Sequence, residues 1–143
     1  MVQLIQIADR GAAGHPAGSA PAPISDVEAA AMARAVVRLF SHWGVSDAEA
    51  CVLLGELSPR TYARWKAGEP GRIGRDLKAR LSNLMGVHKA LRIIFTDAAR
   101  AYRWIKRPNA AFGGRSALDV MLQGELLDLV RVRRYLDAER GGW

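Results

Sequence analysis

The clearest chemical signal in the sequence is a short basic segment that also carries hydroxyl side chains. Between residues 60 and 80, seven lysines and arginines stand against two acidic residues, and the whole chain has a net charge of +7. Guanidinium groups can bridge two acceptors on guanine, and Ser or Thr hydroxyls can contact bases or phosphates. The side chains that we expect to make such contacts are Ser58, Arg60, Thr61, Arg64 and Lys66. The composition therefore favours a polyanionic partner.

The remaining reactive side chains show no arrangement typical of catalysis. The three histidines, His15, His42 and His88, lack companions at the spacing of a metal site or a catalytic triad. No glycine-rich phosphate loop follows a strand pattern. The single cysteine, Cys51, excludes an internal disulfide and lies in an apolar helical stretch, so we expect it to be buried. We expect neither an enzyme nor a bound cofactor or metal.

Apolar spacing and capping signals predict an all-α fold. Residues 1–24 are rich in Ala, Gly and Pro and predict a flexible tail. Ser25 and Glu28 form a capping-box pattern that begins the first helix. Helices over 47–54 and 59–67, joined by a turn at 55–57, have the lengths of a helix-turn-helix, although the turn is one residue longer than the commonest spacing. The alternative is a small helical subdomain with a solvated basic face.

The second half of the chain predicts further helices. One helix is expected to bury its apolar residues between Ile73 and Leu84. Further helices place the apolar residues from Val87 to Ile105 on one stripe, and Pro108 ends the last of these helices. After Gly113 and Gly114, Ser116 caps a short helix, and an apolar stripe then extends over Leu122, Leu126, Leu129, Val132 and Leu136, interrupted only by Gly124. No alternating pattern is long enough to indicate a strand.

Two segments carry a resemblance to a known family. The first segment is the run from Ser58 to Gly68, which follows Leu53-Leu54-Gly55. The second is Phe112-Gly113-Gly114-Arg115-Ser116-Ala117-Leu118-Asp119, together with the tail from Val132 to Gly141. With these segments, residues 28–143 resemble the Xre/MbcA/ParS-type antitoxins. Ala117 departs from the pattern, since relatives often carry proline there. The resemblance implies a helix-turn-helix domain at 25–86 and a toxin-binding domain at 87–143.

The resemblance also implies a partner and a mode of action. Family members neutralise a RES-domain toxin, a protein similar to ADP-ribosyltransferases that consumes NAD or transfers its ADP-ribose. Their helix-turn-helix domain supports dimerisation and, in many members, represses the shared operon. We expect toxin contacts from Arg115, Arg131, Arg134, Tyr135, Arg140, Gly141, Gly142 and Trp143. In this hypothesis the glycines tether Trp143, whose burial contributes up to ~3 kcal/mol, and its carboxylate pairs with an arginine of the toxin's nucleotide pocket. The alternative is a frayed chain end.

The sequence predicts a cytoplasmic protein without membrane contact. No apolar run approaches the roughly 18 residues needed to span a bilayer, and no secretory signal pattern begins the chain. Half-site recognition of operator DNA and a small helical core both favour a homodimer or a larger assembly. The alternative function is a stand-alone helix-turn-helix transcriptional regulator. A neighbouring reading frame that encodes a toxin-like protein would favour the antitoxin function over this alternative.

Overall fold

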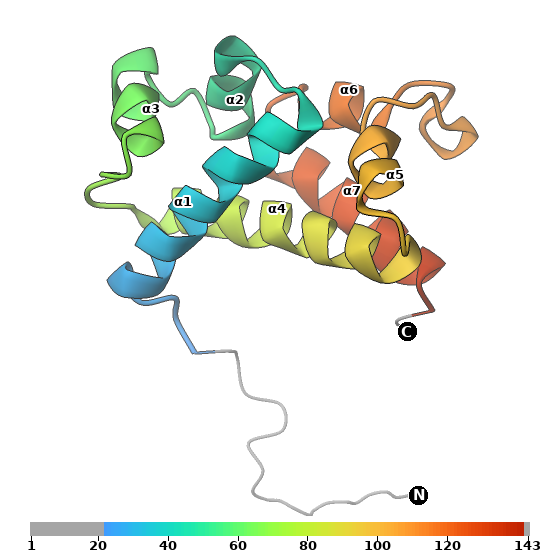
Figure 1. Ribbon diagram of the computed structural model, residues 1–143, viewed down its shortest axis with the longest axis horizontal. Coiled ribbons are helices and arrows are strands. Elements are labelled where there is room, and N and C mark those ends of the chain that lie inside the picture. Colours follow the sequence, from blue (N-terminus) through green and yellow to red (C-terminus); the bar gives the residue numbers. More distant parts are fainter. Residues whose placement is uncertain (1–21, 142–143) are drawn as a thin grey trace, which may run out of the picture.

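The computed structural model describes residues 22–141, and the elements named in that range are all helical. They are α1 (Asp26–Trp43), α2 (Asp47–Leu53), α3 (Pro59–Lys66), α4 (Arg75–Ile94), α5 (Ala98–Trp104), the 3₁₀ helix η2 (Ala110–Phe112), α6 (Ala117–Met121) and α7 (Leu126–Glu139). The all-α prediction is confirmed (Figure 1). The predicted tail over 1–24 lies almost wholly outside the described residues. None of the described helices is both long and apolar enough to cross a lipid bilayer.

Side-chain caps fix where the helices begin. The Ser25 hydroxyl accepts from the backbone N–H of Glu28 at 3.1 Å, and the Glu28 carboxylate accepts from the Ser25 N–H at 3.0 Å. The same reciprocal pair starts α2 at Ser46 and α6 at Ser116. Each cap satisfies backbone donors that have no partner within the helix. The helix starts predicted from these serines are confirmed.

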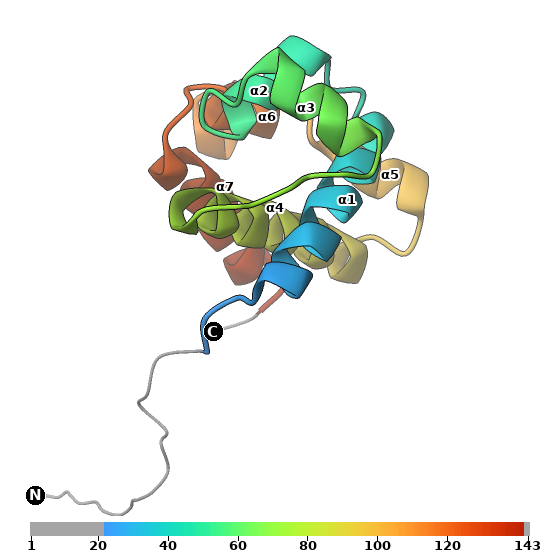
Figure 2. The same ribbon diagram turned by 90° about the vertical axis from the view of Figure 1, so that its left-hand side faces the viewer.

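Helix α4 joins the two halves of the chain. It runs unbroken through residue 86, where the sequence predicts separate helices and where the expected domain boundary falls. Its apolar residues pack against α1 and, more extensively, against α7. Figures 1 and 2 show α4 as a long rod with α1 crossing it and α7 alongside. The helix-turn-helix and the C-terminal elements are therefore attached to one continuous helix.

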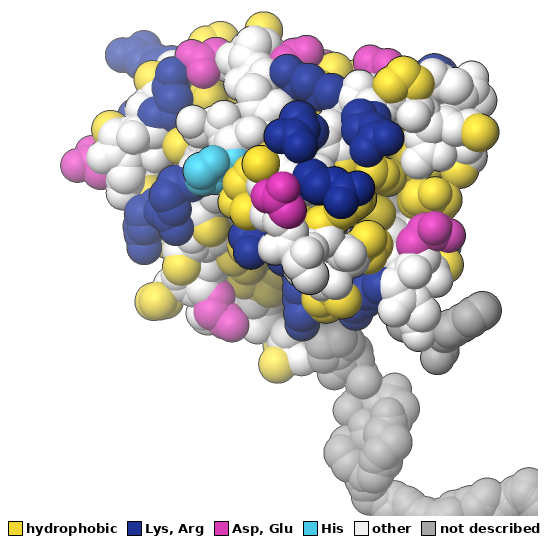
Figure 3. Space-filling view, turned by 45° about the vertical axis from the view of Figure 1, so that its right-hand side comes forward, with side chains coloured by type: hydrophobic (Ala, Val, Ile, Leu, Met, Phe, Trp, Pro, Cys, Tyr) yellow, Lys and Arg dark blue, Asp and Glu magenta, His cyan; other side chains and the backbone are white. Residues whose placement is uncertain are grey.

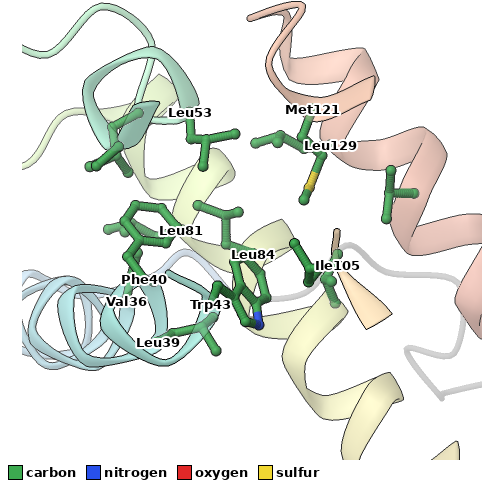
Figure 4. Close-up of a cluster of buried hydrophobic side chains, with 14 of the residues drawn as sticks. Val36, Leu39, Phe40, Trp43, Leu53, Leu81, Leu84, Ile105, Met121 and Leu129 are labelled. Atoms are coloured by element: carbon green, nitrogen blue, oxygen red, sulfur yellow. The ribbon is translucent and has the colours of Figure 1, made fainter. Parts of the chain in front are cut away.

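A single buried cluster draws side chains from both halves. Phe40, Leu53, Leu84, Ile105 and Leu129 are each 1% exposed or less, and they come from α1, α2, α4, the end of α5 and α7. Figure 4 shows these side chains converging on Leu84 of α4. Two buried indole N–H groups, those of Trp43 and Trp65, have no acceptor in the described part of the chain.

The predicted stripe from Leu122 to Leu136 is interrupted at Gly124, and its first residue, Leu122, lies at the C-terminal cap of α6 and not in α7. Helix α6 ends at Met121 and α7 begins at Leu126. Gly124 lies between them with φ +94°, a backbone angle that side-chain-bearing residues rarely adopt. The glycine is therefore the turning point between α6 and α7.

Leu129→Ala tests whether the two halves share one core. We expect the free energy of unfolding to fall by about 2–5 kcal/mol because a fully buried leucine is truncated. Hydrogen exchange should accelerate in α2 and α3 as much as in α7. Leu127→Ala is the control, since Leu127 lies on the same helix but is 76% exposed, and it should change stability by under ~0.5 kcal/mol. Unchanged exchange in α2 and α3 would show that the halves unfold separately.

Candidate functional site

The turn between α2 and α3 has an unusual backbone. Gly55 has φ +77° and Glu56 has φ +68°, and Glu56 is the sole non-glycine residue with positive φ in the part that the structure describes. The N–H groups of Glu56 and Leu57 both donate to the carbonyl of Cys51, at 2.9 and 3.1 Å. These bonds close the end of α2 and redirect the chain toward α3. Cys51 itself is buried, as predicted, and burial raises the pKa of its thiol.

A buried arginine of α4 holds this turn in place. Arg80 is 7% exposed, and its Nη1 donates to the carbonyl of Leu53 at 3.3 Å. Its Nε donates to the carboxylate of Asp76, also at 3.3 Å. A Cβ built on Gly55 would lie 2.7 Å from Arg80 Nε, so the guanidinium lies directly against the turn. In the sequence, Arg80 is one of the seven cations of the basic segment. Two features of the sequence could have indicated that Arg80 is buried: the four-residue spacing from Asp76 and the glycine at position 55.

Two buried aromatics set the rotation of α3. Tyr62 and Trp65 are 3% and 2% exposed, so the opposite face of α3 is turned outward. Burial, with a further contribution from Asp47, raises the pKa of Tyr62 to about 12. Arg60 and Arg64 lie on the exposed face. The structure therefore brings these two predicted DNA contacts to the surface together.

The other three predicted DNA contacts have partners within the chain. The Ser58 hydroxyl caps α3 by accepting from the Thr61 N–H, and it donates to Thr61 Oγ1 at 2.9 Å. Lys66 forms an ion pair with Asp47 of α2 and lies 5.6 Å from the centre of the Tyr62 ring. Ser58 and Lys66 thus stabilise the helix-turn-helix itself, and exposed ion pairs of this kind contribute about 0–1 kcal/mol.

An aromatic cluster lies on the C-terminal half. The ring of Trp104 stacks on Tyr135 at 6.2 Å between centroids, and Phe112 meets Tyr135 edge to face at 5.1 Å. The Arg131 guanidinium lies 5.4 Å from the Phe112 ring centre. Tyr135, a predicted toxin contact, is therefore half-buried between α5, η2 and α7. Arg131 covers the same cluster from the solvent side.

The loop before α6 is shaped by its two glycines. Gly113 and Gly114 have φ +68° and +86°, and a Cβ at either position would meet no atom within 4 Å. Glycine is required at these two positions because of their positive φ angles, and not because neighbouring atoms would clash with a side chain. Arg115 is exposed, and its Nη2 donates to the Asp119 carbonyl at 3.3 Å. This predicted toxin contact therefore lies beside α6.

The remaining predicted toxin contacts that the structure describes are Arg134 on α7 and, after its last residue Glu139, Arg140 and Gly141. Arg134 is exposed and makes no side-chain hydrogen bond or ion pair with the described residues, whereas Arg140 Nε lies 3.6 Å from Asp137 Oδ1. Gly141 has φ +76°, and its N–H donates to the carbonyl of Ala138 at 3.1 Å. A glycine in this conformation ends a helix. Gly142 and Trp143 lie outside the described residues.

The exposed surface of this half is basic and partly apolar. Figure 3 shows Lys and Arg side chains gathered near the middle of this face, with hydrophobic side chains between them. Interfaces commonly combine arginine with aromatic side chains in this way. Within residues 22–141, no three His, Cys, Asp or Glu side chains are grouped closely enough to hold a metal ion.

Comparison with known proteins assigns both halves. Residues 22–86 match the antitoxin Xre-like helix-turn-helix domain, and residues 90–142 match the antitoxin Xre/MbcA/ParS C-terminal toxin-binding domain. These features define a helix-turn-helix antitoxin, and the chain belongs to the Xre/MbcA/ParS antitoxin family. A relative from Sinorhizobium fredii (strain NBRC 101917 / NGR234), named "Uncharacterized protein y4oB", is 44% identical over 125 residues, covering 87% of this chain and 95% of that protein.

Gly55→Ala tests the contact between Arg80 and the turn. Alanine with positive φ costs about 1–2 kcal/mol, and the added methyl group would also displace the buried guanidinium, which adds about 1–3 kcal/mol. Gly68→Ala is the matched control, because Gly68 has φ +89° and a methyl group added there would meet no atom within 4 Å. Chemical denaturation should show a larger loss for Gly55→Ala. Equal losses would mean that Arg80 does not support the turn.

Proposed function

We propose that this antitoxin neutralises a RES-domain toxin by covering its active site with α7 and the segment that follows it. The observation that carries the proposal is the Trp104–Phe112–Tyr135 cluster covered by Arg131, with the exposed Arg134 on the same helix and Gly141 just after the end of α7. The family match to the toxin-binding domain extends to residue 142, so it includes the chain beyond α7. The resemblance to the Xre/MbcA/ParS-type antitoxins supports the proposal that the toxin is a RES-domain protein.

The chemistry of this surface suits protein recognition. Arginine and aromatic side chains are enriched among the residues that dominate binding energy. Arg131 is already positioned on an aromatic ring, so its ordering on binding costs less than that of a free side chain. Arg134, which has no side-chain partner among residues 22–141, would pair with a carboxylate or carbonyl of the toxin. Gly141 and Gly142 provide a narrow connection to the Trp143 side chain, which we propose enters the toxin's NAD cleft.

Removing residues 141–143 tests the role of that segment. The fold should be unchanged, because Arg140 and Gly141 are exposed and lie outside the buried core. Affinity for the toxin should fall by up to roughly 100-fold, the equivalent of burying one indole. Titration of purified toxin and rescue of growth on co-expression measure the effect.

Val27→Ala is the control for that truncation, since it removes an apolar side chain that is 80% exposed on α1, far along the chain from α7. It should leave neutralisation intact. Full protection by the truncated chain would eliminate the proposed occlusion by the tail.

We further propose that a dimer of this antitoxin represses its own operon, with α3 in the major groove of operator DNA. The support is the exposed position of Arg60 and Arg64 on the side of α3 opposite the buried Tyr62 and Trp65. Bidentate arginine–guanine pairs each contribute about 1–3 kcal/mol of base discrimination. Ser58 and Thr61 lie at the N-terminal end of the same helix, beside the proposed base contacts.

The double variant Arg60→Ala/Arg64→Ala should abolish retardation of the gene's own upstream DNA in a gel assay. Both side chains are exposed, so stability should be unaffected. Arg34→Ala/Lys89→Ala is the matched control, since it removes the same charge from exposed positions on α1 and α4. Equal retardation by both variants and the parent protein would dismiss DNA recognition by α3.

A further inference from the structure

A groove lies between the C-terminal ends of α1 and α5, apart from both surfaces described above. Its volume is about 580 Å³, which falls in the range of small-molecule sites. Trp43 and Pro108 contribute apolar lining, His42 and Tyr102 contribute ring surfaces, and Arg103 and Arg107 lie along the edge. None of the proposed DNA or toxin contacts lines this groove.

The floor of the groove is built for flat ligands. The rings of His42 and Tyr102 are stacked, with centroids 4.5 Å apart and planes within 4° of parallel. Trp43 is 3% exposed, and its indole N–H has no acceptor within the described part of the chain. In Figure 4 the indole nitrogen of Trp43 lies at the edge of the buried cluster, away from Leu53 and Met121. A ligand with a planar ring would extend the existing stack at the exposed His42.

The charge around the groove is positive throughout. Arg103 and Arg107 are exposed and form no ion pair or side-chain hydrogen bond with residues 22–141. Lys106 Nζ donates to the carbonyl of Gly44 at 2.8 Å, which fixes its ammonium group at the rim. The residues that line the groove include no Asp or Glu. Three cations therefore converge on an apolar floor without a neutralising carboxylate.

The neighbouring surface has the same sign. A smaller cavity of about 180 Å³ shares His42 and Tyr102 with the groove and adds Arg38 and His88. Burial lowers the pKa of His88, and the charges of Arg92 and His42 lower it further. In the view of Figure 3, a histidine-coloured patch lies beside Lys and Arg side chains. An anion entering the groove would meet positive charge from Arg38 of α1 and Arg103 of α5.

We propose that this groove binds a nucleotide, with its base stacked on the His42–Tyr102 pair and its phosphates held by Arg103, Lys106 and Arg107. The concave shape and the stacked rings favour a small ligand with a planar group, and the unpaired guanidiniums supply charge-assisted hydrogen bonds to phosphate. An acidic peptide would satisfy the cations but leave the ring surfaces unused. This site is independent of the toxin and of operator DNA.

Calorimetric titration of the full-length chain with ATP, tripolyphosphate and adenosine tests the proposal. ATP should bind at one site per chain and at least fivefold more tightly than tripolyphosphate, because the base adds stacking to the phosphate contacts (roughly 1 kcal/mol). Arg103→Gln/Arg107→Gln should weaken ATP binding by roughly tenfold or more. Circular dichroism should show an unchanged fold, since both side chains are exposed.

Arg72→Gln/Arg75→Gln is the matched control, because it removes two exposed cations from the basic segment near the start of α4. It should bind ATP like the parent protein. Equal weakening by both double variants, or equal affinity for ATP and tripolyphosphate, would reduce the effect to general attraction of polyanions and overturn the site. The proposal would also be overturned if ATP binding were undetectable and Arg103→Gln/Arg107→Gln bound the toxin more weakly than the parent protein. That result would assign the groove to toxin binding. Toxin neutralisation is measured separately, so failure here leaves the proposed function standing.

Discussion

The packing of α4 against both α1 and α7 is the constraint on which the rest of the structure depends. Leu81 and Leu84 of α4 are fully buried, and they meet side chains from the helix-turn-helix and from the C-terminal elements in one cluster. Burial of apolar surface from both halves in a shared core supplies the main driving force for folding. Helix α7 packs directly on α4, whereas α3 packs on α1 and α2, and α1 in turn packs on α4. A protein that must present one surface to DNA and another to a toxin gains fixed positions for both from this arrangement.

Two arginines connect the outer helices to α4. Arg80 extends from α4 to the carbonyl of Leu53 and supports the turn that leads into α3. Arg133 extends from α7 to the carbonyl of Ser82 at 3.5 Å, and its guanidinium occupies the space that a Cβ on Gly86 would need. Gly86 therefore removes side-chain bulk beneath Arg133 and permits this contact. Each arginine hydrogen-bonds the main chain of a neighbouring element, so the two surfaces are fixed by polar contacts as well as by the core.

Local signals made much of the fold predictable, and tertiary contacts account for the rest. The capping serines Ser25, Ser46 and Ser116 act within four residues, so the sequence shows their role directly. The exposure of Arg60 and Arg64 followed from helical spacing against Tyr62 and Trp65. The continuity of α4 was not predictable, because Gly86 usually weakens a helix and its compensating contact comes from Arg133 far along the chain. The ion pair of Lys66 with Asp47 and the half-burial of Tyr135 likewise depend on elements distant in sequence.

The central claim is that the toxin engages α7 and its C-terminal extension while α3 stays open to DNA. Hydrogen–deuterium exchange of the complex with the protein encoded by the neighbouring gene measures this most directly. We predict slower exchange on complex formation in the last turns of α7 and in residues 109–116, with the amides of α3 unchanged. Protection confined to α3, or the failure of the two proteins to form a complex, would contradict it.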